Sequence, residues 1–269
     1  MTARPDLATA FHALHQGPAI LRLPNAWDAG SARLIESLGA KAIATTSAGV
    51  AWVHGYPDGD KLPVDLLVAT IAGIARVTAI PVSADIEGGY SDDPNEVGAV
   101  VTAVIEAGAV GINLEDGGGS PDLLVAKIEQ ARAAAERASV DFFVNARTDV
   151  YLRGLATGEA AVAESVARAR RYADAGADGI FVPGVSDPAE IAALAAAIDR
   201  PLNVLARPGL PDAEELQRLG VARLSAGSGI CQSLFGQTRR LAEAFLSDGA
   251  SGPLGEGAMS YPEINGLFR

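Results

Sequence analysis

Short apolar runs alternate along this chain with longer, alanine-rich amphipathic segments, and the alternation repeats eight times. Short apolar runs are typical of buried strands, and apolar residues spaced three and four apart are typical of helices that pack on them. The segments 93–108 and 158–176 are two such helices, and each ends at a glycine, a frequent helix terminator. The predicted strands are 19–23, 41–45, 80–84, 110–114, 141–145, 178–182, 202–206 and 222–226.

Eight strand-helix units within about 250 residues predict an α/β fold of the (β/α)8 TIM barrel type. A doubly wound open sheet is the alternative, but no G-x-G-x-x-G follows the first strand and no second domain boundary is visible. We expect the barrel to occupy residues 1–247. Residues 248–269 are expected to form a glycine-rich linker and a C-terminal tail, whose last segment "YPEINGLFR" is apolar enough to dock on a surface.

The composition excludes several classes of protein. The 269 residues are 49% hydrophobic and carry a net charge of −12, which argues against a nucleic-acid partner because phosphate backbones bind clusters of Lys and Arg. No apolar run approaches the length of a membrane span, and the first residues lack the apolar core of a signal peptide. The single cysteine, Cys231, excludes an internal disulfide and fits a reducing compartment. We therefore expect a cytoplasmic protein.

Polar side chains follow several of the predicted strands, where barrel enzymes place their active sites. Carboxylates from neighbouring strands that converge on one mouth repel one another unless a cation lies among them, and such oxygen ligands suit Mg²⁺ or Mn²⁺. Arg147 adds the positive charge that a small anionic carboxylate substrate needs. The polar residues that follow strands two to five are Ser47, Asp85, Glu87, Glu115, Asp116 and Arg147.

Five motifs resemble, in order, those of one known family. The stretches "LPNAWDAGSARLIESLGAKAIATTSAGVA", "GYPDGD", "SADIEGGY", "NLED" and "NARTD" are similar to segments of the isocitrate lyase and phosphoenolpyruvate mutase superfamily, and the similarity covers roughly residues 20–230. The resemblance implies a TIM barrel that exchanges a C-terminal helix between subunits, and hence a homo-oligomer, a dimer or a tetramer. It also implies lyase or mutase chemistry through an enolate.

The resemblance assigns a metal site to the acidic residues. It implies that Asp85 is the direct ligand of Mg²⁺ or Mn²⁺ and that Glu87 and Glu115 hold the waters of the ion. Asp58, in "GYPDGD", is implied to be a further carboxylate that faces these waters or the substrate. On this basis Asp58 and Glu115 are also candidate catalytic residues.

The substrate residues follow from the same motifs. Ser47 and Ala48 match the loop whose backbone N–H groups hold a substrate carboxylate, close to Asp85. Arg147 matches the arginine that grips the reacting oxyanion, which makes it both a binding and a catalytic residue. A metal ion and a guanidinium would together stabilise negative charge as it develops on oxygen.

The chain departs from the family in the lid that follows Leu-Glu-Asp. The lyases carry Lys-(Lys/Arg)-Cys-Gly-His there, whereas "NLEDGGGSPDLLVAKIEQ" has no Cys, no His and no Lys before Lys127. Decarboxylation of an oxaloacetate-type substrate needs no initial deprotonation, so we predict this reaction, with Asp58 or His54 as the base if isocitrate-type cleavage occurs instead. Phosphorus–carbon bond chemistry on a phosphonate and a catalytically silent binding role are the alternatives.

Overall fold

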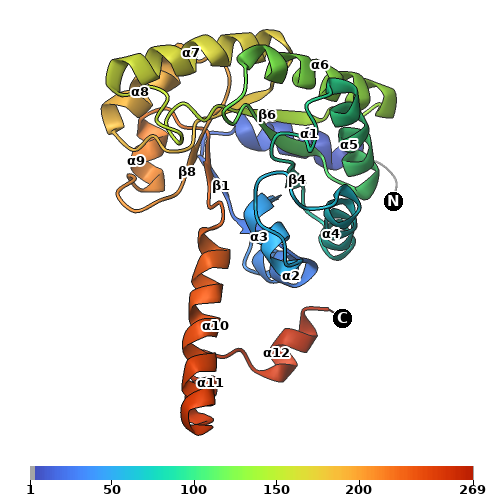
Figure 1. Cartoon of the computed structure of the whole chain (residues 1–269), viewed down its shortest axis with the longest axis vertical. Coiled ribbons are helices and arrows are strands. Elements are labelled where there is room, and N and C mark those ends of the chain that lie inside the picture. Colours follow the sequence, from blue (N-terminus) through green and yellow to red (C-terminus); the bar gives the residue numbers. More distant parts are fainter. Residues whose placement is uncertain (1–3, 269) are drawn as a thin grey trace.

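The computed structural model describes residues 4–268, and within them nine parallel strands form a nearly closed barrel with helices on its outside (Figure 1). The strands follow the order β1-β9-β8-β7-β6-β5-β4-β3-β2. All eight predicted strands are present, with bounds that differ by a few residues. The strands are β1 (Leu21–Leu23), β2 (Asn25–Ala26), β3 (Ile43–Thr45), β4 (Val82–Asp85), β5 (Gly111–Glu115), β6 (Phe143–Arg147), β7 (Gly179–Phe181), β8 (Leu202–Leu205) and β9 (Arg223–Ser225).

The extra strand comes from a break in the first predicted strand. Pro24 divides it into β1, which pairs with β9, and β2, which pairs with β3. Proline has no backbone N–H and cannot continue a hydrogen-bonded ladder. The stretch 21–26 therefore joins the two ends of the sheet covalently, and the prediction of a strand at 19–23 was wrong by two residues at its start and missed its continuation beyond Pro24.

Helices alternate with the strands and cover the barrel. The two predicted helices are α5 and α7, and the glycine that follows α5, Gly108, has a φ of 106°, a conformation that side chains with a Cβ rarely adopt. The helices are α1 (Pro5–His15), α2 (Ala29–Ser37), α3 (Ser47–Val53), α4 (Val64–Val77), α5 (Pro94–Ala107), α6 (Pro121–Ala138), α7 (Gly158–Asp174), α8 (Pro188–Ala197), α9 (Ala213–Arg218), α10 (Gly229–Asp248), α11 (Gly252–Gly255) and α12 (Tyr261–Gly266).

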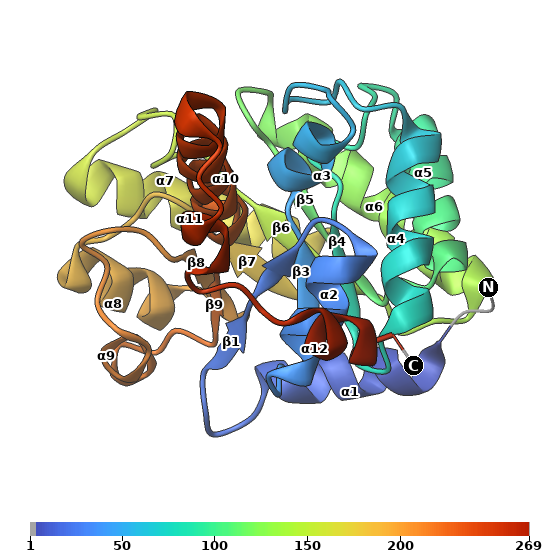
Figure 2. The same ribbon diagram turned by 90° about the horizontal axis from the view of Figure 1, so that it is seen from below.

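The best covered side of the barrel lies under α4, α5 and α6, which run side by side over the strands (Figure 2). Val97, Val101 and Val104 of α5 and Ile128 of α6 have no or almost no exposed surface and belong to the main apolar core. Burying side chains of this kind stabilises the fold by about 1.5–3 kcal/mol each. None of the helices within residues 4–268 has the length and apolar character that crossing a membrane requires.

Helix α1 closes the amino-terminal end of the barrel. Phe11 and His15 project from it onto Phe143, the first residue of β6, with ring centroids 5.4 and 4.0 Å from that ring. Gly111, the first residue of β5, lies under the same cluster, and a Cβ added there would be 3.1 Å from the ring of Phe11. The aromatic rings therefore pack directly against the strand ends, and this end of the barrel is a packed apolar floor.

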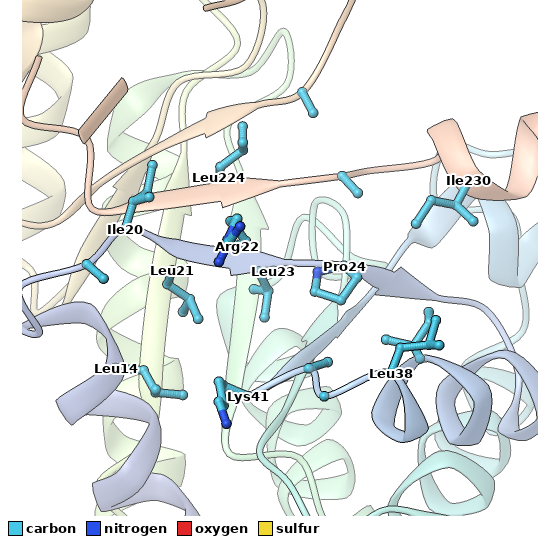
Figure 3. Close-up of a pocket in the computed structure, with 16 residues that line it drawn as sticks. Leu14, Ile20, Leu21, Arg22, Leu23, Pro24, Leu38, Lys41, Leu224 and Ile230 are labelled. Carbon is cyan, nitrogen blue, oxygen red and sulfur yellow. The ribbon is translucent and has the colours of Figure 1, made fainter. Parts of the chain in front are cut away.

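Helix α10 leaves the barrel instead of covering it (Figure 1). Within this fully described helix of 20 residues, Cys231 is the one buried residue. A groove of about 820 Å³ runs along the outer face of β1, where an eighth covering helix would lie in a regular barrel. Leu14, Leu23 and Leu224 line it (Figure 3). The chain thus has both an uncovered apolar strand face and an uncovered apolar helix.

The C-terminal tail returns to the barrel beside α2 (Figure 2). The Nε atom of Arg33 donates a hydrogen bond of 2.7 Å to the backbone oxygen of Leu267. A cavity of about 470 Å³ lies between α2, α10 and the tail, with Phe268 in its lining. The tail of this chain therefore contacts its own barrel.

Candidate active site

Three of the predicted residues meet at the carboxyl ends of neighbouring strands. Asp85 ends β4, Glu115 ends β5 and Arg147 ends β6. The register pairs Glu115 directly with Arg147 and pairs Asp85 with Asn113, two residues before Glu115. Since side chains two residues apart on a strand share a face, the three side chains lie on the same face of the sheet. We call the group formed by Asp85, Glu87, Glu115, Arg147 and Asp149 the mouth.

Arg147 is held by two carboxylates. Its Nη1 atom lies 2.5 Å from Oε2 of Glu115, and its Nε and Nη2 atoms lie 2.6 and 3.0 Å from the two carboxylate oxygens of Asp149. Asp149 is buried, whereas Arg147 and Glu115 each keep about 16% of their side chains exposed. A guanidinium fixed on both sides in this way presents its remaining N–H groups in a set orientation. The sequence prediction missed Asp149, although its place two residues after Arg147 is a signal that it shares the same face.

Glu115 is a strongly perturbed acid. Burial raises the pKa of its carboxyl to about 8, Arg147 opposes this rise, and the charges of Asp85 and Asp149 add to it. Arg147 in turn has a raised pKa because Glu115 and Asp149 stabilise its charged form, although burial opposes this. The pair therefore holds a proton more tightly than isolated side chains do, as is typical of groups at active sites.

Asp85 lies at the centre of the mouth and is buried. Its carboxylate accepts two long hydrogen bonds, at 3.5 Å from the N–H of Ser47 and at 3.4 Å from the N–H of Glu87. Its own N–H donates to Oγ1 of Thr45 at 2.7 Å, which fixes the backbone. Burial raises the pKa of Asp85, and Arg147 opposes the rise. A buried carboxylate with only long hydrogen bonds is suited to a further positive partner.

Ser47 and Ala48 lie in the first turn of α3, and both are buried. The side chain of Thr46 caps this helix by accepting a bond from the N–H of Gly49. The N–H of Ser47 donates to Asp85, so this backbone donor faces the mouth. The role of Ser47 and Ala48 in binding a substrate carboxylate stays a prediction.

Glu87 fastens the loop that follows α3. Its Oε2 atom accepts the N–H groups of Gly59 and Asp60 at 2.7 and 2.5 Å, and Oε1 accepts the hydroxyl of Tyr90 at 3.1 Å. Burial raises the pKa of Glu87 to about 7. Asp60, Glu87 and Tyr90 all have a positive φ, near 55°, 52° and 63°. Non-glycine residues in this region are strained, and such strain gathers at functional sites.

Two other predicted residues, Asp58 and His54, make no hydrogen bond to the residues of the mouth that the structure records. Asp58 is exposed, but its charge raises the pKa of Asp85, so it lies near the mouth. His54 is exposed, and its Nε2 atom is 2.8 Å from Oγ1 of Thr70 on α4. Asp116, which also follows β5, is buried and accepts bonds from Arg168 and Tyr172 of α7. Asp116 thus faces the opposite side of the sheet from its neighbour Glu115 and supports the barrel wall.

The donor set fits a hard divalent cation held largely through water. Among residues 4–268, no group of three or more His, Cys, Asp or Glu side chains is placed to hold a metal ion together. Glu115 is paired with Arg147 and Glu87 is bonded to the loop, which leaves Asp85 as the carboxylate with the weakest partners. One direct carboxylate and several waters is an arrangement that Mg²⁺ commonly adopts in proteins. The assignment of these three ligands stays a prediction.

Comparisons with known proteins identify the family of this chain and several relatives. The family model of phosphoenolpyruvate phosphomutase matches residues 11–246. An uncharacterized protein of Mycobacterium tuberculosis is 42% identical over 81% of this chain and 82% of its own length. An oxaloacetate decarboxylase of Pseudomonas entomophila is 33% identical over 80% of this chain and 76% of its own.

Two solved structures are also similar to this chain in sequence and fold. A putative phosphonomutase from Burkholderia cenocepacia covers 88% of this chain with 99% of its own, at 41% identity and a TM-score of 0.85. A phosphonopyruvate hydrolase, crystallised with oxalate and Mg²⁺, covers 99% of this chain with 95% of its own, at 26% identity and a TM-score of 0.84.

Proposed function

The chain belongs to the phosphoenolpyruvate phosphomutase family within the isocitrate lyase and phosphoenolpyruvate mutase superfamily, and from this premise we propose that it is an Mg²⁺-dependent carbon–carbon lyase. Its substrate is a small 2-oxo or 2-hydroxy dicarboxylate, and oxaloacetate is the best match. The observation that carries the proposal is the Arg147–Glu115 pair, 2.5 Å apart, beside the buried Asp85 at the carboxyl ends of the strands.

The residues at and beside the mouth have separate roles in substrate binding and in charge stabilisation. The backbone N–H groups of Ser47 and Ala48 bind the substrate carboxylate. Arg147, fixed by Glu115 and Asp149, directs its free N–H groups at the substrate oxygen on which negative charge develops. Mg²⁺, held by Asp85 directly and by Glu87 and Glu115 through water, would supply Lewis-acid polarisation of the same carbonyl.

The short glycine-rich segment after β5 favours one of the possible carbon–carbon cleavages. Retro-aldol cleavage of a 2-hydroxy acid requires a base for the hydroxyl and an acid for the carbanion. The segment after β5 supplies glycines in place of such groups, and His54 is turned to Thr70. Loss of CO₂ from a 2-oxo acid with a β-carboxylate needs no initial deprotonation, because the carbonyl accepts the electron pair as an enolate. Asp58, whose charge adds to the raised pKa of Asp85, is our candidate for ordering the water that protonates the enolate. We therefore favour decarboxylation.

A product assay tests the reaction. With Mg²⁺, oxaloacetate is expected to release pyruvate faster than in a protein-free control containing the same Mg²⁺, and chelation of the metal abolishes the difference. Isocitrate and methylisocitrate are expected to be inert. Fast cleavage of methylisocitrate would show that Asp58 or His54 provides a base, and the decarboxylase proposal would then fall.

Phosphorus–carbon bond chemistry is the second candidate, favoured by the likeness to a phosphonomutase and to a phosphonopyruvate hydrolase. Hydrolysis of phosphonopyruvate to pyruvate and phosphate, or its rearrangement to phosphoenolpyruvate, without turnover of oxaloacetate, would establish it. A silent binding protein, the third possibility, would bind oxalate in the presence of Mg²⁺ and turn over neither compound.

The uncovered apolar surfaces support a homo-oligomer. Leu234 and Phe235 of α10 are about half exposed, and the groove along β1 lacks the helix that covers other strands. A second copy whose α10 fills this groove would bury both surfaces at once. Light scattering is expected to give a multiple of 27.4 kDa, and a monomer would refute the exchange. The cytoplasmic location stays a prediction.

A further inference from the structure

The glycine-rich segment after β5 leaves room that the side chain of Arg153 occupies. A Cβ added to Gly118 would lie 3.4 Å from Nη1 of Arg153, and one added to Gly117 would lie 3.6 Å from Nη2. The same position on Gly117 is 4.0 Å from Oε1 of Glu115. One methyl-sized position therefore touches both the Arg153 guanidinium and a carboxylate of the mouth. Arg153 therefore lies at the rim of the site, beside the glycine-rich segment that follows β5.

The turn that follows β6 brings Arg153 to this place. The N–H of Arg153 donates to the backbone oxygen of Asp149 at 2.9 Å, and its Nε atom lies 3.5 Å from Oδ2 of the same residue. Asp149 is buried and already binds Arg147 through both oxygens. The carboxylate of Asp149 thus contacts two guanidinium groups, those of Arg147 and Arg153.

Arg153 is the less fully paired of the two guanidinium groups. The short bonds of Asp149 and Glu115 are directed to Arg147, and the single contact of Arg153 with Asp149 is longer. The Arg153 side chain is 54% exposed, so its guanidinium reaches solvent beside the mouth. The planar fork of arginine suits two-point recognition of a carboxylate or a phosphonate.

We propose that Arg153 is a specificity-determining residue that binds the second acidic group of the substrate, a carboxylate or a phosphonate. This rests on the proposed function, in which the first carboxylate lies at Ser47 and the reacting oxygen lies at Arg147. A substrate with an acidic group beyond the reacting carbon extends from Ser47 past Arg147 to Arg153, whereas a two-carbon acid such as oxalate leaves Arg153 unused. A Cβ at Gly117 or Gly118 would already contact the guanidinium, so a branched side chain at Gly118 is expected to press on it.

Binding measurements isolate this role from catalysis. Calorimetry on the Mg²⁺-loaded protein compares oxalate, which ends at the reacting oxygen, with 3,3-difluorooxaloacetate and phosphonopyruvate, which carry a distal carboxylate and a distal phosphonate. Arg153→Met is expected to lower the binding affinity for at least one of the two longer ligands by about tenfold or more. The affinity for oxalate is expected to change less than about twofold. The ligand that weakens identifies the distal group. Arg153→Lys is expected to restore part of the loss.

Two further variants sharpen the test. Gly118→Val retains Arg153 but pushes its guanidinium aside, so it is expected to reproduce the selective loss. Arg137→Met removes an exposed arginine in the last turn of α6, at the end of that helix opposite the mouth, and is expected to bind all three ligands like the native protein.

The outcomes separate this inference from the proposed function. If native protein binds oxalate but Arg153→Met leaves both longer ligands unchanged, or weakens oxalate equally, the role of Arg153 is overturned and the proposed function stands. If the native protein binds none of the three ligands with Mg²⁺, both fall together.

Discussion

The two ends of the barrel satisfy their buried groups in opposite ways. At the mouth, buried acids crowd together, and burial raises the pKa of Glu115 to about 8 and that of Glu87 to about 7. At the amino-terminal end, Phe11 and His15 of α1 pack their rings on Phe143. One end is rich in charge that a ligand can balance, and the other is apolar and closed. The difference teaches that function and stability are separated along the barrel axis.

The separation predicts that substitutions at the two ends change different quantities. A change at the mouth is expected to alter ligand binding and turnover with a smaller loss of folding stability, because crowded acids stabilise a fold poorly. A change at the amino-terminal end is expected to lower the free energy of unfolding while the remaining folded protein keeps its turnover.

The largest expected effect is that of Phe11→Ala. Phe11 has no exposed surface, and its loss would open a cavity beside Gly111 and Phe143. Phe→Ala substitutions in cores cost about 3–5 kcal/mol. Denaturant unfolding is expected to show this loss, with turnover per folded molecule unchanged. A specific loss of turnover in the folded fraction would show that the two ends are coupled.

Arg147→Lys tests the role of the mouth, at the carboxyl-terminal end of the barrel, in turnover. Lysine has a point charge instead of a fork, and it cannot satisfy Glu115, Asp149 and an oxyanion together. Turnover is expected to fall by about 10²–10³-fold, or about 2.7–4 kcal/mol, the range for loss of one oxyanion donor. The unfolding free energy is expected to fall as well, because Asp149 loses part of its bonding, but by less than in Phe11→Ala because a positive charge remains. Turnover within a few-fold of the native value would make Arg147 a structural residue.

Asp85→Ala is expected to weaken divalent binding by at least about 100-fold, or about 2.7 kcal/mol. The variant removes a buried carboxylate whose pKa is raised by burial, so the metal-free protein is expected to be as stable as the native one or more so. Calorimetry with Mg²⁺ and Mn²⁺, together with thermal unfolding, checks both parts. Unchanged metal affinity would move the ion to another ligand.

The smallest effect is the pH dependence of His15. Burial lowers the pKa of its imidazole to about 3, with Arg223 adding to the shift, whereas the unfolded chain titrates near 6.5. The unfolded state therefore binds more protons between pH 6.5 and 3, and stability contributed by the neutral ring is lost as the pH falls through that window. Between pH 7 and 5 the loss is about 2 kcal/mol.

A matched variant isolates this contribution from that of the acids. His15→Phe keeps a ring on Phe143 but cannot titrate, so the difference in unfolding free energy between the two proteins should depend on pH in this window. In the metal-free protein Glu115 acts with the opposite sign, because its raised pKa favours the folded state as the pH falls below 8. A pH-independent difference between native protein and variant would contradict the burial of a neutral His15.

The sequence predicted the barrel and the core of the mouth because both follow from strand periodicity. Apolar runs located the eight strands, and strand ends located Asp85, Glu115 and Arg147. Side chains alternate between the two faces of a strand. Extended beyond the strand ends, this alternation would have placed Asp149 on the same face as Arg147 and Asp116 on the opposite face from Glu115. These two misses were therefore avoidable.

Other features depend on contacts that periodicity does not encode. The N–H groups of Gly59 and Asp60 donate to Glu87, and both Glu87 and Asp60 have a positive φ, which residue type does not reveal. The place of Arg153 depends on a turn after β6 and on the absence of side chains at Gly117 and Gly118. Long-range packing, and not local pattern, positions these groups.

The division of the first strand at Pro24 also has a consequence for how the protein is made. The β1 residues Leu21–Leu23 pair with Arg223–Ser225, which leave the ribosome roughly 200 residues later. At about 5–20 residues per second, β1 stays without this partner for roughly 10–40 s of synthesis. Its neighbour β2 can meet β3 after only about 20 residues. Pro24 thus separates an early pairing from a late one, and a nascent chain remains an open, curved sheet until β9 arrives to close the ring.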